Sequence, residues 1–169
     1  DADADADADT DADADADEDT GTAADDTAAS DLYWVWVSAA GNHTCGVLSN
    51  GQVKCWGHNE YGEASPPEGS FQMVTTSSSH SCALDASGSV QCWGDDTDGQ
   101  ASPPEGTFET IDAGSGYTCG VTSSGDLQCW GRDSYGRASP PEGTFESVSA
   151  GIQHTCAIDS TGIIQCWGY

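Results

Sequence analysis

The residues with the clearest chemical potential are eight cysteines, which form four pairs of identical spacing. Nine residues separate the members of each pair, and successive pairs follow at intervals of 37 residues. The pairs are Cys45 and Cys55, Cys82 and Cys92, Cys119 and Cys129, and Cys156 and Cys166. Structural zinc sites usually bring two thiols about two to four residues apart, so this spacing favours disulfide bonds. Free or metal-bound thiols are the alternative.

Each cysteine pair brackets a predicted β-hairpin. In the middle of the nine intervening residues, two small or polar residues are followed by a glycine. Glycine adopts a left-handed conformation without steric cost, so this triplet suits a three-residue hairpin loop. With the turn placed there, Val47 opposes Val53 and Cys45 opposes Cys55. Directly opposed residues are close enough for a disulfide, so we predict one disulfide within each hairpin. The turn glycines are Gly51, Gly88, Gly125 and Gly162.

A further strand is predicted ahead of each hairpin. An aromatic residue, two variable residues and then Val or Ile recur at the same 37-residue interval, in residues 34–37, 71–74, 108–111 and 145–148. Strand and hairpin together predict an all-β fold with about three strands per repeat. The repeats cover residues 32–169, with approximate boundaries at 34–70, 71–107, 108–144 and 145–169.

Residues 1–31 form a low-complexity arm of Asp, Ala and Thr. The arm holds 14 of the 29 acidic residues and none of the three basic residues, and the formal net charge of the chain is −26. A row of like charges repels itself and Ala is a poor strand former, so we predict a disordered acidic spacer. Weak Ca²⁺ binding by the carboxylates and a stalk glycosylated on its threonines are alternatives.

The composition also restricts compartment and partners. Paired cysteines predict an oxidising compartment, so the protein is expected to be secreted or on the cell surface. Three basic residues cannot form a nucleic-acid-binding patch, and no apolar run is long enough for membrane insertion. The chain begins at Asp1 rather than Met, so we expect a processed product or a fragment. The arm resembles linkers that follow the lipid-modified cysteine of bacterial surface lipoproteins, which implies a lipid or surface anchor upstream of the chain.

A longer pattern connects the hairpins to a known family. From His43 to Gly62 and from His80 to Gln100 the chain carries His-Thr/Ser, then Gly-x-Val-x-x-Trp-Gly, then a loop that ends in Gly. This pattern resembles the regulator-of-chromosome-condensation repeat, over residues 32–169. The resemblance implies a β-propeller. The two cysteines and the short period are similar to a bacterial, extracellular branch of the family, and to a secreted β-lactamase inhibitor with three-stranded blades.

The number of repeats leaves the closure of the propeller open. Members of the family usually have about seven blades, and this chain has four repeats. If each blade is a hairpin plus the following aromatic strand, the strand Trp34–Val37 is left over. It then closes the ring within one chain, or completes the last blade of a neighbouring chain and builds a ring or filament. A third alternative is that the chain is a fragment of a longer propeller.

Histidine and tryptophan each recur at one position of the repeat. A propeller distributes equivalent positions around a ring, so we expect the histidines to bond to neighbouring backbone rather than to share a metal, and the tryptophans to pack between blades. Asp96-Thr97-Asp98-Gly99 is weakly similar to a calcium loop, which leaves weak Ca²⁺ binding as an option. The sequence shows no nucleophile–base pair and no phosphate-binding glycine loop. We therefore predict no catalytic, metal-binding or cofactor-binding residues, and a protein that is not an enzyme. The recurring residues are His43, His80 and His154, with Tyr117 in the third repeat, and Trp56, Trp93, Trp130 and Trp167.

The predicted function is binding or adhesion, through the loops at residues 58–63, 95–100 and 132–137. The partner is a protein or a copy of this chain. One alternative is a self-assembling subunit that donates Tyr33–Val37 to the next chain, and another is a secreted enzyme inhibitor. The candidate partner contacts are Tyr33, Trp34, Trp36, His58, Tyr61, Asp96, Asp98, Arg132 and Tyr135.

Overall fold

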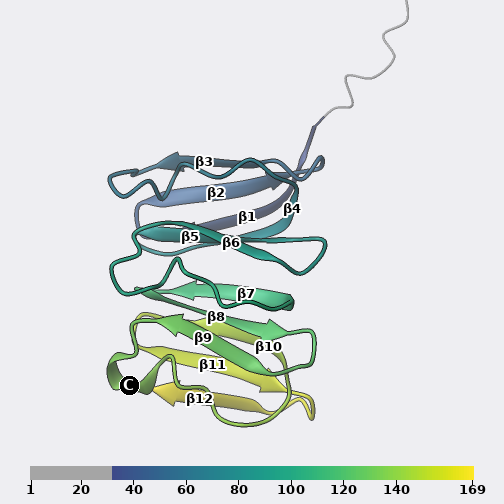
Figure 1. Ribbon diagram of the computed structural model, residues 1–169, viewed down its shortest axis with the longest axis vertical. Coiled ribbons are helices and arrows are strands. Elements are labelled where there is room, and N and C mark those ends of the chain that lie inside the picture. Colours follow the sequence, from purple (N-terminus) through teal and green to yellow (C-terminus); the bar gives the residue numbers. More distant parts are fainter. Residues whose placement is uncertain (1–31) are drawn as a thin grey trace, which may run out of the picture. The chain divides into compact units, whose positions relative to one another are not determined.

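The computed structural model describes residues 32–169, so the predictions made for residues 1–31 lie outside the described residues. The described part contains twelve β-strands and one short 3-10 helix, η1 (Ser134–Gly136). The strands form four antiparallel sheets of three strands each (Figure 1). The predicted all-β fold with three strands per repeat is therefore confirmed. Within this part of the chain, no helix is long and apolar enough to cross a bilayer.

Each sheet is one blade, and its three strands are consecutive in the sequence. The first strands are β1 (Trp34–Ala40), β4 (Phe71–Thr76), β7 (Phe108–Gly114) and β10 (Phe145–Ala150). The middle strands are β2 (His43–Leu48), β5 (His80–Asp85), β8 (Tyr117–Thr122) and β11 (His154–Asp159). The third strands are β3 (Val53–Gly57), β6 (Val90–Gly94), β9 (Leu127–Gly131) and β12 (Ile164–Gly168).

The first strand of every blade precedes its hairpin, so the alternative that groups each hairpin with the following strand is wrong. β1 pairs with β2 of its own blade, with Val37 opposite Gly46. The fourth blade is complete as well, because β10 pairs with β11 and β11 pairs with β12. Trp34–Val37 is therefore not a spare strand, and the fold offers no incomplete blade to receive one.

The hairpins have the predicted register. Cys45 lies opposite Cys55 and Val47 opposite Val53. The turn residue Gly51 has a φ of 85°, in the left-handed region that glycine adopts freely. The structure joins the same four cysteine pairs that the sequence predicts, at Cα–Cα distances of 4.0–4.1 Å, and the described residues contain no free cysteine.

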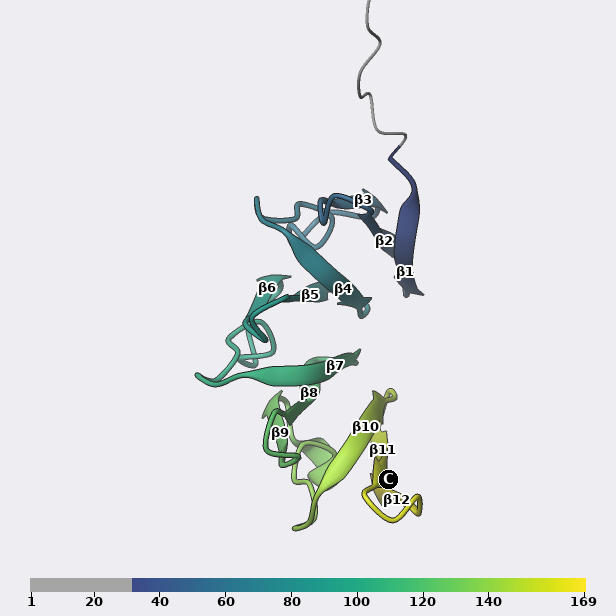
Figure 2. The same ribbon diagram turned by 90° about the vertical axis from the view of Figure 1, so that its right-hand side faces the viewer.

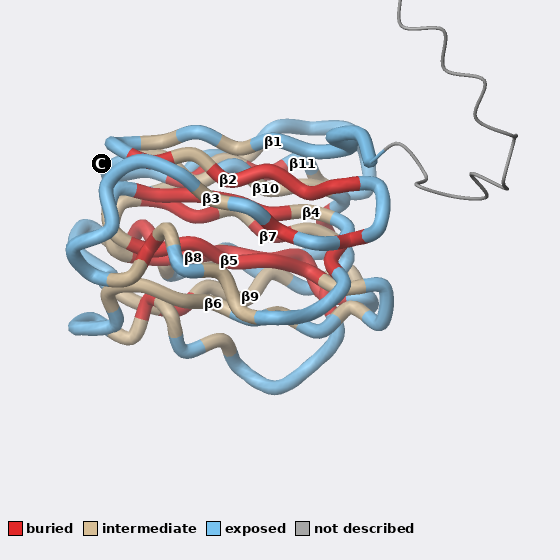
Figure 3. Tube along the Cα trace, turned by 90° about the horizontal axis from the view of Figure 1, so that it is seen from above, coloured by how far each residue is buried: buried red, intermediate tan, exposed pale blue. Residues whose placement is uncertain are grey.

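The core of the protein lies between blades. Figure 2 shows the four sheets fanned so that the first strands lie on the inner side and the third strands on the outer side. Three clusters of buried apolar residues fill the three interfaces between successive blades. The middle strands of the first three blades are almost entirely buried, whereas β11 is partly exposed (Figure 3). The predicted packing of tryptophans between blades holds for Trp93, Trp130 and Trp167.

Candidate functional site

Three equivalent loops connect each third strand to the first strand of the next blade. They contain residues 58–63, 95–100 and 132–137, and we call their combined surface the loop face. Each loop is closed by one side-chain oxygen that accepts a hydrogen bond from the backbone amide five residues later. The three acceptors are Asn59, Asp96 and Asp133, at 2.9, 2.8 and 2.7 Å. The loops therefore share one backbone geometry although their side chains differ.

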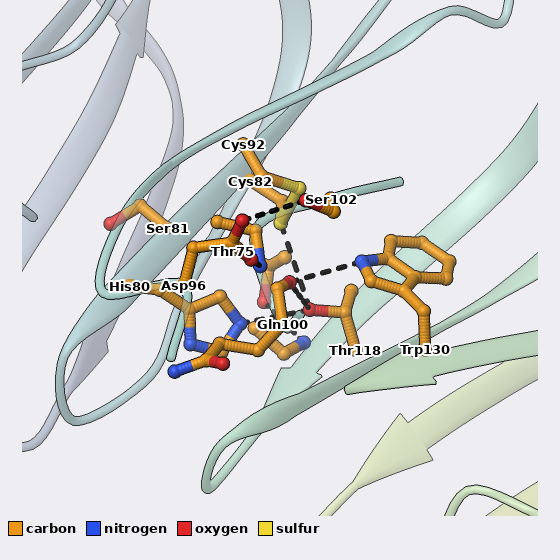
Figure 4. The surroundings of a disulfide bond; sticks show 12 residues. Thr75, His80, Ser81, Cys82, Cys92, Asp96, Gln100, Ser102, Thr118 and Trp130 are labelled. Carbon is orange, nitrogen blue, oxygen red and sulfur yellow. Dashed lines mark hydrogen bonds between the residues drawn. A yellow bond between two sulfur atoms is a disulfide. The ribbon is translucent and has the colours of Figure 1, made fainter. Parts of the chain in front are cut away.

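The last residue of each loop is a buried anchor. Glu63, Gln100 and Arg137 occupy equivalent positions and are almost fully buried despite their polarity. The backbone carbonyl of each anchor accepts the indole N–H of the next blade's tryptophan, as for Gln100 and Trp130 at 3.0 Å. The same carbonyl accepts a hydroxyl proton, as from Thr118 at 3.2 Å (Figure 4). Two donors from the following blade therefore hold the base of every loop.

A histidine completes this network in the first two interfaces. His80 Nε2 lies 2.8 Å from the hydroxyl of Thr118 (Figure 4). Because Thr118 gives its own proton to Gln100, it accepts from His80, and the imidazole must carry its proton on Nε2. His43 and Ser81 repeat the arrangement at 2.7 Å. The partners of these histidines are hydroxyl groups and not the backbone groups that the sequence predicts.

The third and fourth repeats differ from the first two at the histidine position. Tyr117 directs its hydroxyl to Thr155 at 2.8 Å and to the backbone oxygen of His154 at 2.7 Å. His154 itself is exposed, because no blade follows it within the described residues. The side chain at this position therefore hydrogen-bonds to the following blade in the first three repeats, and the histidines do not converge on a common site.

His58 and Glu63 form an ion pair within the first loop. His58 Nδ1 lies 2.6 Å from a carboxylate oxygen of Glu63. This hydrogen bond raises the pKa of His58 above its ordinary value, against the smaller opposing effect of burial. Burial favours the neutral form of Glu63, but hydrogen bonds from His58 and from the amide of Tyr61 together lower the pKa of Glu63. His58 is half exposed and its ring is held in one orientation.

Neighbouring loops are joined by a second ion pair. Arg132 lies 2.7 Å from a carboxylate oxygen of Asp98, across the second and third loops. Both side chains remain partly exposed. Asp96 has a different role, because its two oxygens accept from Ala101 and from the hydroxyl of Ser102. Asp96 therefore closes its loop, as Asn59 and Asp133 close theirs.

Two tyrosines project from the loop face. Tyr61 is exposed on the first loop, and Tyr135 is exposed on the third loop, where it adopts a φ of 67°. The Tyr135 ring lies 5.3 Å from that of Tyr169. The loop face thus combines two aromatic rings with charged groups on a rigid base. Groups of three or more His, Cys, Asp or Glu side chains that could hold a metal are absent from residues 32–169.

The remaining predicted contacts lie elsewhere, on the first blade. Tyr33 and Trp34 are exposed at the start of β1, and Trp34 packs edge-on against Trp56 at 5.7 Å. Trp36 is half exposed and donates its indole N–H to the backbone oxygen of Val74 at 2.8 Å. The structure therefore separates the predicted contact residues: one group lies on the loop face, Tyr33 and Trp34 are exposed on the first blade, and Trp36 is directed toward the second blade.

The sequence prediction overlooked the buried anchors Glu63, Gln100 and Arg137. Arg137 places its guanidinium 5.1 Å from the Tyr117 ring and donates to the backbone oxygen of Ile152 at 2.6 Å. The three anchors are an acid, an amide and a base, so their side chains gave no shared chemical pattern by which to recognise the position. They could have been recognised only by their place in the repeat, because each directly follows the loop glycine.

The four repeats match a known sequence family. The sequence model of the regulator of chromosome condensation (RCC1) repeat matches residues 37–63, 74–100, 108–137 and 145–169. No individually curated protein matches the chain in sequence.

Solved propellers have the same blade arrangement. The ectodomain of the Physcomitrella patens receptor kinase CR4 is 31% identical with a TM-score of 0.72, and the match covers 85% of this chain and 43% of that one. The CRINKLY WD40 ectodomain of the Arabidopsis thaliana receptor kinase ACR4 is 27% identical with a TM-score of 0.70, covering 85% and 54%. Prp20p from Saccharomyces cerevisiae is 19% identical with a TM-score of 0.68, covering 81% and 44%, and shows the fold alone.

This chain therefore spans about half the length of these solved propellers. Its four repeats have the matched sequence pattern, its four sheets have the blade arrangement, and its loops are anchored in one way throughout. The chain belongs to the RCC1 repeat family.

Proposed function

We propose that the protein is a secreted or cell-surface binding module, and that the loop face is the surface that contacts a partner protein. The observation that carries this proposal is the combination of a constant base with variable tips. All three loops have the same closing hydrogen bond and the same buried anchor carbonyl. Beyond the closing residue, their exposed and variable tips are Glu60-Tyr61, Thr97-Asp98 and Ser134-Tyr135.

A rigid base favours binding because little conformational entropy is lost when the partner is bound. The ion pair between Asp98 and Arg132 reduces loop motion further, since it connects two neighbouring loops. Tyr61 and Tyr135 are suited to be anchors, because tyrosine offers a large contact area with few rotatable bonds. Acidic groups outnumber basic ones on the loop face, so its partner is a protein with a complementary basic surface.

The disulfides and two of the similar solved structures support a secreted or cell-surface location. Four disulfides persist only where the environment is oxidising. The two plant propellers with 31% and 27% identity are both receptor-kinase ectodomains. These observations support a location outside the reducing cytosol, where a partner protein would be met.

The test compares capture of surface and secreted proteins by three immobilised forms of the chain. The loop variant carries Tyr61→Ser and Tyr135→Ser, and the control carries Ile163→Ser at a hairpin turn, where the side chain is equally exposed. Because aromatic anchors dominate interface energies, the loop variant should capture its partner at least about tenfold less, and the control should capture it normally. Equal capture by all three forms, or loss in the control alone, would show that the loop face is not the binding surface.

A further inference from the structure

Every interface between blades is built from two distinct halves. The forward half, contributed by the earlier blade, contains the disulfide and β-branched residues such as Val47 and Val53. The backward half, contributed by the later blade, contains an aromatic residue and a small one, such as Phe71 and Ala83, together with Val74. The other two interfaces use the equivalent positions with related residues. In the second, Leu84 and Val90 pack against Phe108 and Ile111, and in the third, Val121 and Leu127 pack against Phe145 and Val148. Each blade therefore has a forward face and a backward face, and only unlike faces meet.

The first and last blades each keep one face uncovered. On the backward face of the first blade, Val37 is 66% exposed, whereas its equivalent Val74 is 1% exposed between blades. On the forward face of the last blade, Ile164 is 67% exposed, whereas its equivalent Val53 is 5% exposed. The two ends of the repeat array are thus the two halves of one interface. Other apolar residues left exposed there are Trp34 and Trp56 on the first blade and Ile158 on the last.

The polar groups of the two end faces are complementary as well. The histidines of the first two forward faces donate to a hydroxyl on the backward face of the next blade, as His43 does to Ser81, and Tyr117 bonds to the equivalent hydroxyl of Thr155. His154 is the equivalent histidine on the last blade, and it is exposed. Thr44 is the equivalent hydroxyl on the first blade, and it is only partly buried. A contact between the ends would pair His154 with Thr44.

A pocket on the last blade corresponds to the place that an aromatic ring takes inside the array. Its volume is about 230 Å³, and Ser147, Cys156, Ile158 and Ile164 are among the residues that line it. In the first interface, the ring of Phe71 packs with Val47 and Val53, the counterparts of Ile158 and Ile164. The residue equivalent to Phe71 on the open backward face is Trp34.

We propose that the forward face of the last blade binds the backward face of the first blade of a second copy of this chain. Trp34 of one copy would then enter the pocket beside Ile164 of the other. The contact joins unlike surfaces, so it either closes a ring of copies or extends a filament, according to its rotation. This proposal does not depend on the loop face, which stays uncovered in such an assembly.

The charge of the protein gives this contact a characteristic salt dependence. Residues 32–169 contain 15 acidic and three basic residues, so two copies repel each other over long distances. Salt screens this repulsion, with a Debye length of about 8 Å at physiological ionic strength, and leaves apolar burial intact. Association should therefore strengthen as salt is added, in contrast to an interface held by ion pairs.

The experiment measures the mass of the full 169-residue chain by light scattering, up to about 100 µM and at two salt concentrations. Val37→Asp and Ile164→Asp each place a charge on one end face, at positions whose exposure leaves the fold unaffected, as circular dichroism would verify. Each variant alone should be a monomer of 17.4 kDa. Tyr61→Asp, a change to an equally exposed residue on the loop face, should assemble like the parent chain.

Mixing the two end-face variants identifies which surfaces meet. The Val37→Asp chain keeps its forward face and the Ile164→Asp chain keeps its backward face, so an equimolar mixture should form a complex of two chains that grows no further. A parent chain that stays monomeric would overturn the proposal. A parent chain that assembles while the mixture stays monomeric would overturn it too, because like faces would then be in contact.

Discussion

His80 should make the stability of the protein depend on pH in a measurable way. Its side chain is fully buried between the second and third blades. Nε2 donates to Thr118, and Nδ1 has no hydrogen-bond partner among the described residues. Burial lowers the pKa of His80 to about 4, and the nearby charges of Asp95 and Asp96 oppose this only weakly. The folded protein therefore holds His80 in its neutral form.

The sign and the size of the effect follow from linkage. In the unfolded chain, His80 has its ordinary pKa of 6.5, so the unfolded state takes up a proton first as the pH falls. The contribution of neutral His80 is fully present above pH 6.5 and is lost between pH 6.5 and about 4. Over this window the free energy of unfolding should decrease by about 3 kcal/mol.

The assay compares the parent chain with His80→Gln by urea unfolding at pH 7 and pH 4, with all disulfides intact. Glutamine offers a side-chain N–H in place of Nε2–H but does not titrate. Carboxylates and the other histidines contribute equally to both proteins, so their effects cancel in the difference. The stability of the parent relative to the variant should therefore fall by about 3 kcal/mol from pH 7 to pH 4.

His58 provides a control of opposite sign. Its pKa is raised by Glu63, so its contribution is present at low pH and is lost as the pH rises through the folded-state pKa. The variant His58→Gln should accordingly lose more stability at low pH than at high pH. A difference between the parent and His80→Gln that does not change with pH would refute the assignment of a buried neutral histidine.

Two further predictions concern glycine substitutions and disulfide reduction. Gly94→Ala should lower the free energy of unfolding by about 2 kcal/mol or more, because a Cβ there would lie 2.5 Å from the backbone oxygen of Ser79. Gly99→Ala has free space around the Cβ and should lower it by about 1 kcal/mol. Equal losses in thermal unfolding would contradict this steric account. Under mild reduction, alkylation followed by peptide mapping should label Cys166 before Cys82, because Cys166 is exposed on the last blade and Cys82 is fully buried between blades. Simultaneous labelling of both would argue against the burial of the inner disulfides.

The hairpins were predictable because their information is local. The turn glycine sets the register, and the alternation of side chains along a strand then places Cys45 opposite Cys55 and on the same face as Val47. None of these steps needs a contact outside the repeat. The same reasoning applies unchanged to all four copies.

The assignment of strands to blades could not be predicted from the repeat. A pattern that recurs every 37 residues can be divided at any point, so the aromatic strand fits equally well before or after a hairpin. Strand pairing decides between the two, since Val37 pairs with Gly46 of its own blade, and Trp34 is left exposed on the first blade. The interpretation of Trp34–Val37 as a spare strand was wrong for this reason.

The anchors of the loop face were hidden for a different reason. Glu63, Gln100 and Arg137 act mainly through their backbone carbonyls, which every residue possesses. A function carried by the main chain leaves no constant residue type in the sequence. The donors were visible instead, because a hydroxyl residue follows each member of the histidine position, as Thr118 follows Tyr117.

The arrangement of these donors and acceptors has a consequence for the whole array. Each loop is held by the blade that follows it, as the loop ending at Gln100 is held by Trp130 and Thr118. Stability in such arrays is a sum of repeat and nearest-neighbour terms, so the inner blades gain from two interfaces and the end blades from one. The end blades are where unfolding should begin, and covering Val37 and Ile164 would stabilise them most. A change at the end faces would therefore alter assembly and terminal stability together, while the three loops, each set between two blades of the same chain, keep their geometry.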